Sequence, residues 1–206
     1  YNQYNQDTFI NDDKKEHVLP ISSNETNNLT QEDFEEILFD FDNEIEERVA
    51  AFVSCQQLDA EQILGIINKL CSMFLFSGSS MIKNFFVELI KDSRVFDMTK
   101  LKFAKIIVVR DKKDENFEIL NITIQQIENI PIVLLIDAIK LLMTNDRNRD
   151  DALEYFVTII NSEEYDIDFR YRTILSLDIT LNEEQTKYYI SNSLLEFLFC
   201  ETNASM

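Results

Sequence analysis

The sequence predicts an all-α protein built as a stack of antiparallel helical repeats. Only two glycines and two prolines occur in 206 residues, so the chain has little of the turn chemistry that β-hairpins need. Apolar side chains recur at three- and four-residue spacing along most of the chain, which is the period of an amphipathic helix. Two segments about 70 residues apart match each other, and repeating helical units are expected at spacings of this order.

The N-terminal part is predicted to be a flexible polar tail followed by one capping helix. Residues 1–28 have no helical or alternating period and are rich in Asn, Gln, Asp and Ser. The capping helix is expected over residues 29–55. Thr30 is placed to cap its first turn, and Leu29 is placed to pack on Phe34 across that turn.

The first repeating unit is predicted over residues 58–110 and contains three helices. Gly78 is expected to end the first of them, because helices commonly end at a glycine. The residues predicted to cap the three helices, in chain order, are Asp59, then Ser79 or Ser80, then Asp97.

The second unit is predicted over residues 117–178. Its first stretch, 117–124, alternates like a strand but has no sheet to join, so we expect a loop that enters a helix near Thr123. Pro131 is expected either to kink that helix or to lie in the first turn of a new one. A third, incomplete unit is expected over residues 182–200. The predicted starts of the remaining helices are Asp150 or Arg149, Asp166 or Asp168, and Asn182.

The match between the two units supports this division. NFFVELIKDSRVFDMTKLKFAKIIV, from Asn84, aligns with EYFVTIINSEEYDIDFRYRTILSL, from Glu154, so that Phe86 falls on Phe156. No unit can bury its apolar face alone, and stacked units join their faces into one core. The aromatic residues predicted to lie in that core are Phe74, Phe76, Phe85, Phe86, Phe96 and Phe103.

Residues 165–178, YDIDFRYRTILSLD, place an Asp before a helix that bears Arg170 and Arg172 with aromatic residues between them. This pattern resembles armadillo and HEAT-type repeats, and the resemblance extends over about residues 58–200. It implies an α-solenoid without intrinsic activity whose concave face binds extended peptides or other subunits. The chain begins at Tyr1, and its bias toward Asn, Ile and Lys is typical of an AT-rich genome. We therefore interpret it as a segment of a large structural or transcription-associated protein of a large DNA virus.

The formal net charge of −19 disfavours nucleic acid and anionic membranes, both of which attract Lys and Arg. The longest apolar runs fall far short of the ~20 residues that a membrane span needs. Cys55, Cys71 and Cys200 form no CxxC pair, which argues against a disulfide framework and a zinc site. We expect an intracellular protein, in the cytoplasm, nucleus or a virion, whose partners are other proteins, including basic segments or subunits of a large assembly.

The side chains of common catalytic sites are missing from the sequence. The single histidine, His17, lies in the predicted tail, and Gly65 and Gly78 stand alone, so neither a catalytic triad nor a phosphate-binding glycine loop is indicated. The DFDNE run at 40–44 resembles the start of a calcium loop, but Ile45 stands where that loop needs glycine. We interpret the run as a solvated helix face. The sequence thus predicts no enzyme, no cofactor and no metal.

Two sets of charged residues are candidate partner contacts. Both basic pairs lie in exposed links that are expected on the same edge of the stack, although neighbouring acids also allow a neutralised surface loop. The acidic set lies on the first helix, where the alternative is a solvated face. The candidates are Lys112, Lys113, Arg147, Arg149, Glu35, Glu36, Asp40 and Glu44. The predicted function is a non-enzymatic scaffold for protein–protein contacts, and the alternative is an acidic adaptor or chaperone that binds basic segments.

Overall fold

The computed structural model describes residues 29–128 and 130–176, and every regular element in this part of the chain is an α-helix. This confirms the predicted all-α class. The nine helices are α1 (Gln31–Phe39), α2 (Ile45–Cys55), α3 (Ala60–Ser77), α4 (Ser80–Lys91), α5 (Asp97–Arg110), α6 (Asp114–Gln126), α7 (Ile132–Leu142), α8 (Arg149–Asn161) and α9 (Ile167–Ser176).

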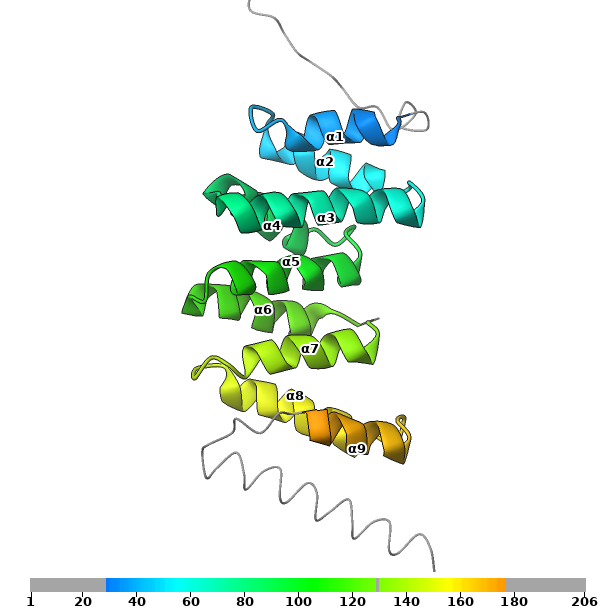
Figure 1. Ribbon diagram of the computed structural model, residues 1–206, viewed down its shortest axis with the longest axis vertical. Helices are drawn as coiled ribbons and strands as arrows, with labels where there is room; N and C mark the ends of the chain where they lie inside the picture. The colour runs from blue at the N-terminus through cyan, green and yellow to red at the C-terminus, as the bar shows by residue number, and fades with distance from the viewer. Residues whose placement is uncertain (1–28, 129, 177–206) are drawn as a thin grey trace, which may run out of the picture.

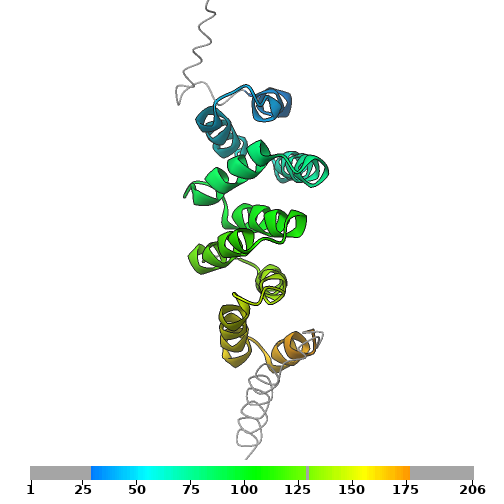
Figure 2. The same cartoon turned by 90° about the vertical axis from the view of Figure 1, so that its left-hand side faces the viewer.

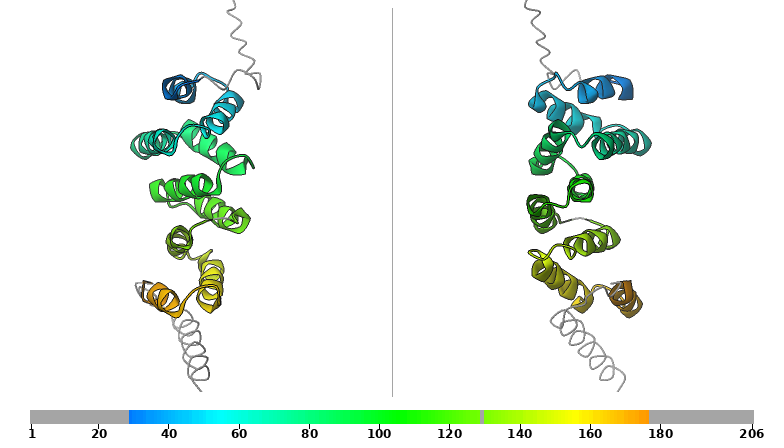
Figure 3. Two further views of the ribbon diagram at one scale, coloured as in Figure 1. Left: turned by 90° about the vertical axis from the view of Figure 1, so that its right-hand side faces the viewer. Right: turned by 60° about the vertical axis from the view of Figure 1, so that its left-hand side comes forward.

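The helices form two layers along the long axis of the molecule (Figures 1 and 2). We call α1, α3, α5, α7 and α9 the odd layer, and α2, α4, α6 and α8 the even layer; Figure 3 shows the same division from two further sides. Most contacts join helices that are neighbours in sequence, and others join next neighbours such as α3 with α5 and α2 with α4. Links alternate between the two sides, so helices of one layer run in the same direction. No described helix is both long and apolar enough to cross a bilayer.

Phenylalanine rings fill the space between the layers. Phe86 on α4 stacks on Phe103 on α5 with ring centroids 4.3 Å apart, and Phe103 also meets the edge of Phe52 on α2 at 5.7 Å. Phe74 on α3 packs against Phe86 at 5.4 Å. The side chains of Phe52, Phe86 and Phe103 are fully buried. Because the rings come from four helices, they tie both layers together.

Two of the predicted core aromatics are exposed instead. Phe76 is 90% exposed and Phe96 is 57% exposed. Phe76 lies in the last turn of α3, two residues before Gly78, and Phe96 is the residue that precedes α5. Both lie at helix ends, where the neighbouring layer no longer covers the chain. Helical spacing in the sequence does not show at which residue a helix extends beyond its packing partner.

The predicted caps at Thr30 and Asp59 are confirmed, whereas Asp97 is the first residue of α5 and Phe96 stands at the cap position. The Thr30 hydroxyl accepts from the Asp33 backbone N–H, and the Asp33 carboxylate accepts from the Thr30 N–H, which completes a capping box. Asp59 and Gln62 form the same arrangement at α3. Gly78 ends α3 as predicted, with φ of 61°, a left-handed conformation that favours glycine.

The single helix predicted over residues 29–55 is wrong, because the chain turns over residues 40–44 and forms α1 and α2. The Asp40 carboxylate accepts from the Asp42 backbone N–H, and the Asn43 side chain donates to the Ile37 carbonyl. Asp and Asn favour turns through bonds of this kind. The DFDNE run is therefore a turn and not a helix face.

The loop predicted over residues 117–124 is also wrong, since these residues belong to α6. Phe117, Leu120 and Ile124 follow helical spacing and are buried. The buried polar residues Asn116 and Asn121 interrupt the apolar pattern there. Of the two alternatives for Pro131, the structure shows a new helix, because α7 begins directly after it. The predicted tail 1–28 and third unit 182–200 lie outside the described residues.

Arg48 on α2 is a buried arginine, only 3% exposed. Its Nε and Nη2 donate to the Leu38 carbonyl at 3.1 and 3.0 Å, and its guanidinium lies over the rings of Phe41 and Phe85. The last carbonyls of a helix have no partner within it and attract positive charge. Burial lowers the pKa of Arg48, and the Asp40 charge opposes this. Arg48 thus fastens the end of α1 to α2 and α4.

We predict that Arg48→Ala lowers the free energy of unfolding by about 2–4 kcal/mol, because it removes charged hydrogen bonds and both cation–π contacts. Urea unfolding followed by circular dichroism measures this change. Glu47→Ala, an exposed neighbour on the same helix, is the control and should change stability by less than about 0.5 kcal/mol. Equal effects of the two substitutions would contradict the structural role of Arg48.

Candidate protein-contact site

The two basic links predicted to share one edge are neighbours in the structure. Asp114, the first residue of α6, accepts from the Asn145 side chain at 3.0 Å and pairs with Arg147 at 3.0 Å. Lys112 and Lys113 directly precede α6. The structure thus brings the links together through a carboxylate that the sequence analysis had not singled out.

Most of the cations in these links are paired with acids. Lys113 lies 2.8 Å from Asp111, which raises the pKa of Lys113, and Arg149 lies 2.6 Å from Asp146. Exposed ion pairs of this kind contribute little to stability, but the two opposite charges in each pair cancel each other's electric field. Lys112 is exposed and forms no ion pair within the described residues. The links therefore form a surface patch of mixed charge.

The four acidic candidates do not form one site. Glu35 pairs with Lys69 on α3 and accepts from the Gln31 side chain, and the bond from Lys69 lowers the pKa of Glu35. It therefore ties α1 to α3. Asp40 supports the turn after α1. Glu36 and Glu44 are exposed, on α1 and immediately before α2.

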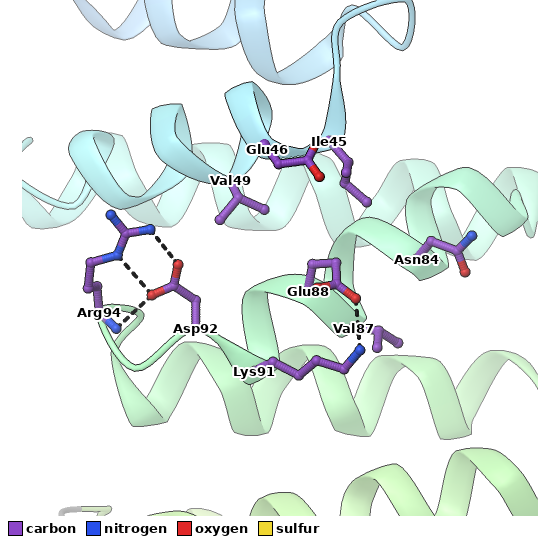
Figure 4. A pocket seen from close by; sticks show the side chains of 9 residues that line it. All are labelled: Ile45, Glu46, Val49, Asn84, Val87, Glu88, Lys91, Asp92 and Arg94. Atoms are coloured by element: carbon purple, nitrogen blue, oxygen red, sulfur yellow. Dashed lines mark hydrogen bonds and ion pairs between the residues drawn. The ribbon is translucent and has the colours of Figure 1, made fainter. Parts of the chain in front are cut away.

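A groove of about 840 Å³ lies in the even layer between α2 and α4 (Figure 4). Ile45 and Val49 contribute apolar surface from α2, and Val87 does so from α4. Four of the five charged lining residues pair with each other, Glu88 with Lys91 at 2.8 Å and Asp92 with Arg94 at 2.6 Å, and the fifth is Glu46. The Arg94 side chain lowers the pKa of Asp92. A groove lined by both apolar and charged side chains is suited to contact with another protein.

Gln56, at the end of α2, holds the α4–α5 loop beside this groove. Its side-chain nitrogen donates to the Arg94 carbonyl at 3.0 Å, and its side-chain oxygen accepts from the Phe96 N–H at 2.9 Å. The groove was not predicted from the sequence, because its residues come together only when α4 packs on α2. The only local signal is the helical spacing of Ile45 and Val49, which predicts a core-facing stripe as readily as a groove.

A polar network joins α6 to α8. Asn121, only 4% exposed, donates to Asp151 at 2.8 Å and accepts from the Tyr155 hydroxyl at 2.9 Å. Gln125 donates to the same hydroxyl at 2.8 Å. Burial of the Tyr155 phenol raises its pKa. The network satisfies buried polar groups between two even-layer helices, so these residues serve the packing of the stack.

No group of histidine, cysteine, aspartate and glutamate side chains within the described residues is arranged to hold a metal ion. Comparison with known protein families, curated proteins and solved structures finds no match to the chain. The chain's own surfaces are therefore the guide to its function.

The two described cysteines are buried, and burial raises the pKa of Cys55 to about 12 and that of Cys71 to about 11. We predict that neither thiol reacts with iodoacetamide at pH 8 in the folded protein, because the thiolate is the reactive form. Both should react after unfolding in urea, and mass spectrometry identifies the labelled peptides.

The same pKa shifts imply a pH dependence. Folding raises the pKa of both thiols above the ordinary 9.0. The contribution of the two buried thiols to the free energy of unfolding is therefore complete below pH 9 and is lost as the pH rises toward 11 and 12. Rapid labelling of Cys55 in the native protein at pH 8 would contradict its burial between the layers.

Proposed function

We propose that the chain is a helical-repeat scaffold that contacts other proteins in a larger assembly. The observation that carries this proposal is the two-layer arrangement (Figure 1), in which helices pack mainly on sequence neighbours. The outer face of each layer is left for partners, and such extended surfaces are what stacked helical arrays use for binding.

Matching burial in the two halves of the stack supports a repeat. Helices α3 and α7 carry equivalent buried positions, as do α4 and α8, and the sequence alignment predicts the same pairing. Phe86 and Phe156 are both fully buried, on α4 and α8 respectively. Further buried pairs are Ile67 with Ile136, Leu70 with Ile139, and Phe74 with Met143.

Contacts within each layer point to a shorter unit than the 70-residue spacing. In the odd layer, Lys69 pairs with Glu35 and Lys102 donates to Asn68, each across 34 residues. In the even layer, Lys83 bonds Glu115 across 32 residues. Twice this offset between next-neighbour helices is close to the spacing of about 70 residues between the matching segments. This agreement supports a two-helix unit in an α-solenoid of armadillo or HEAT type.

We predict that conservative core substitutions in the two halves have local effects. Phe86→Leu and Phe156→Leu should each cost about 1–2 kcal/mol by leaving a small cavity. In a repeat array, hydrogen exchange should accelerate around α3–α5 in the first variant and around α7–α9 in the second, because each unit contacts only its neighbours. Each variant is the control for the other. Uniform acceleration in both would argue for one cooperative core and against the repeat.

A second candidate function, the acidic adaptor for basic segments, is favoured by the charge of the even layer. Its four helices carry nine Asp and Glu against four Lys and Arg. Attraction between exposed charges is screened within about 10 Å at 0.1 M salt, so such binding is salt-sensitive.

Affinity purification of the full chain from its native host, followed by mass spectrometry at low and high salt, tests both candidates. For a scaffold we expect the same proteins to be retained at both salt concentrations, because apolar contacts hold them. For an acidic adaptor we expect basic proteins that are lost at high salt. Recovery of no protein above an unrelated acidic control at either salt concentration would contradict both.

A further inference from the structure

Beyond α1, which carries four acids, the two layers have opposite charge. Helices α3, α5, α7 and α9 together bear eight Lys and Arg against four Asp and Glu, whereas the even layer has an excess of acids. In a chain with a formal net charge of −19, the odd layer beyond α1 is therefore a local basic surface. A charged surface of one sign favours partners of the opposite sign.

Two of the three lysines on α5 lack acidic partners within the described residues, whereas Lys100 pairs with Asp97 at 3.9 Å. Lys102 donates to the neutral side-chain oxygen of Asn68 on α3 at 2.7 Å, and Lys105 forms no ion pair within the part of the chain that the structure describes. In the even layer, by contrast, Lys83 pairs with Glu115 and Lys91 pairs with Glu88. The positive charges of Lys102 and Lys105 are thus available to a partner.

Exposed aliphatic side chains accompany these lysines. Met98 and Val109 on α5 are 51% and 53% exposed, and their spacing from Lys102 and Lys105 places all four residues along one stripe of the helix. Leu64 and Leu75 on α3 are 51% and 38% exposed and share a stripe with Asn68.

The two stripes lie in register. The bond from Lys102 to Asn68 fixes an offset of 34 residues between α3 and α5, and both helices run in the same direction (Figure 1). At this offset Leu64 falls beside Met98, and Leu75 falls beside Val109. We call the surface formed by Leu64, Leu75, Met98, Lys102, Lys105 and Val109 the α3–α5 face.

We propose that the α3–α5 face binds an acidic segment of a partner protein that carries aliphatic side chains. The proposal rests on the scaffold function and names the partner chemistry. The aliphatic rows provide apolar contact at both ends of the face, and the lysines between them select carboxylates. Binding should therefore need both the apolar residues and the charge.

Two other occupants fit less well. A second copy docked face to face would bring Lys102 and Lys105 of each copy together without acids to neutralise them, and like charges across an interface are unfavourable. Nucleic acid would meet few unpaired cations and exposed aliphatic side chains, whereas single strands are bound through aromatic stacking and many basic residues. The net charge of −19 also repels a phosphate backbone.

Selection of random peptides displayed on phage against the full chain, followed by fluorescence anisotropy with the enriched peptides, tests the proposal. We expect enriched peptides to contain Asp or Glu together with Leu, Ile, Met or Val. The variant Lys102→Glu/Lys105→Glu should weaken their binding about tenfold or more. Leu64→Ser/Val109→Ser should weaken it by a similar factor without changing the net charge, because it removes the apolar contact.

The matched control is Lys14→Glu/Lys15→Glu, which changes the net charge equally but lies in the predicted N-terminal tail, away from every candidate contact residue in the sequence. It should leave binding within about twofold. Enrichment of basic peptides, or equal loss of binding in this control, would overturn the proposed face. Binding of single-stranded DNA would also overturn the proposed face if the variant Lys102→Glu/Lys105→Glu abolished that binding. Self-association in sedimentation that the same variant abolished would overturn it too. Failure to enrich any peptide would instead count against the scaffold function itself.

Discussion

Stacked and edge-to-face phenylalanine rings join the two layers, and the arrangement of the helices follows from keeping them buried. Phe86 and Phe103 stack across the layer boundary, while Phe52 and Phe74 pack against them from α2 and α3. A helix with one apolar stripe cannot bury it alone, and each added helix covers the stripes already present. The stack therefore extends along one axis.

Because only the inner side of each helix packs into the shared core, the outer faces of the two layers can differ in charge. The even layer concentrates acids, and its described lysines, Lys83 and Lys91, are paired with them. The odd layer places Lys102 and Lys105 among exposed aliphatic side chains. Arg48 is the exception among the cations, since it is buried at the joint of α1, α2 and α4. Charge in this protein thus has a structural role inside, and we propose a recognition role for it outside.

Features encoded by adjacent residues were predictable, and features that depend on packing were not. Caps at Thr30 and Asp59 need only residues three positions away, so their prediction is confirmed. The turn at 40–44 was missed because the apolar period continues through it, and α6 was missed because Asn121 is polar yet buried. The α3–α5 face depends on the layer to which each helix belongs, and sequence periodicity does not specify that layer.

Carbodiimide coupling tests the layered arrangement most directly, because it joins only carboxylates and amines that already touch. We expect mass spectrometry to identify links between Glu35 and Lys69, and between Glu115 and Lys83, each joining next-neighbour helices of one layer. Couplings across the stack, such as α1 to α7 or α2 to α8, should be absent. Abundant couplings of that kind within a monomer would contradict the two-layer stack.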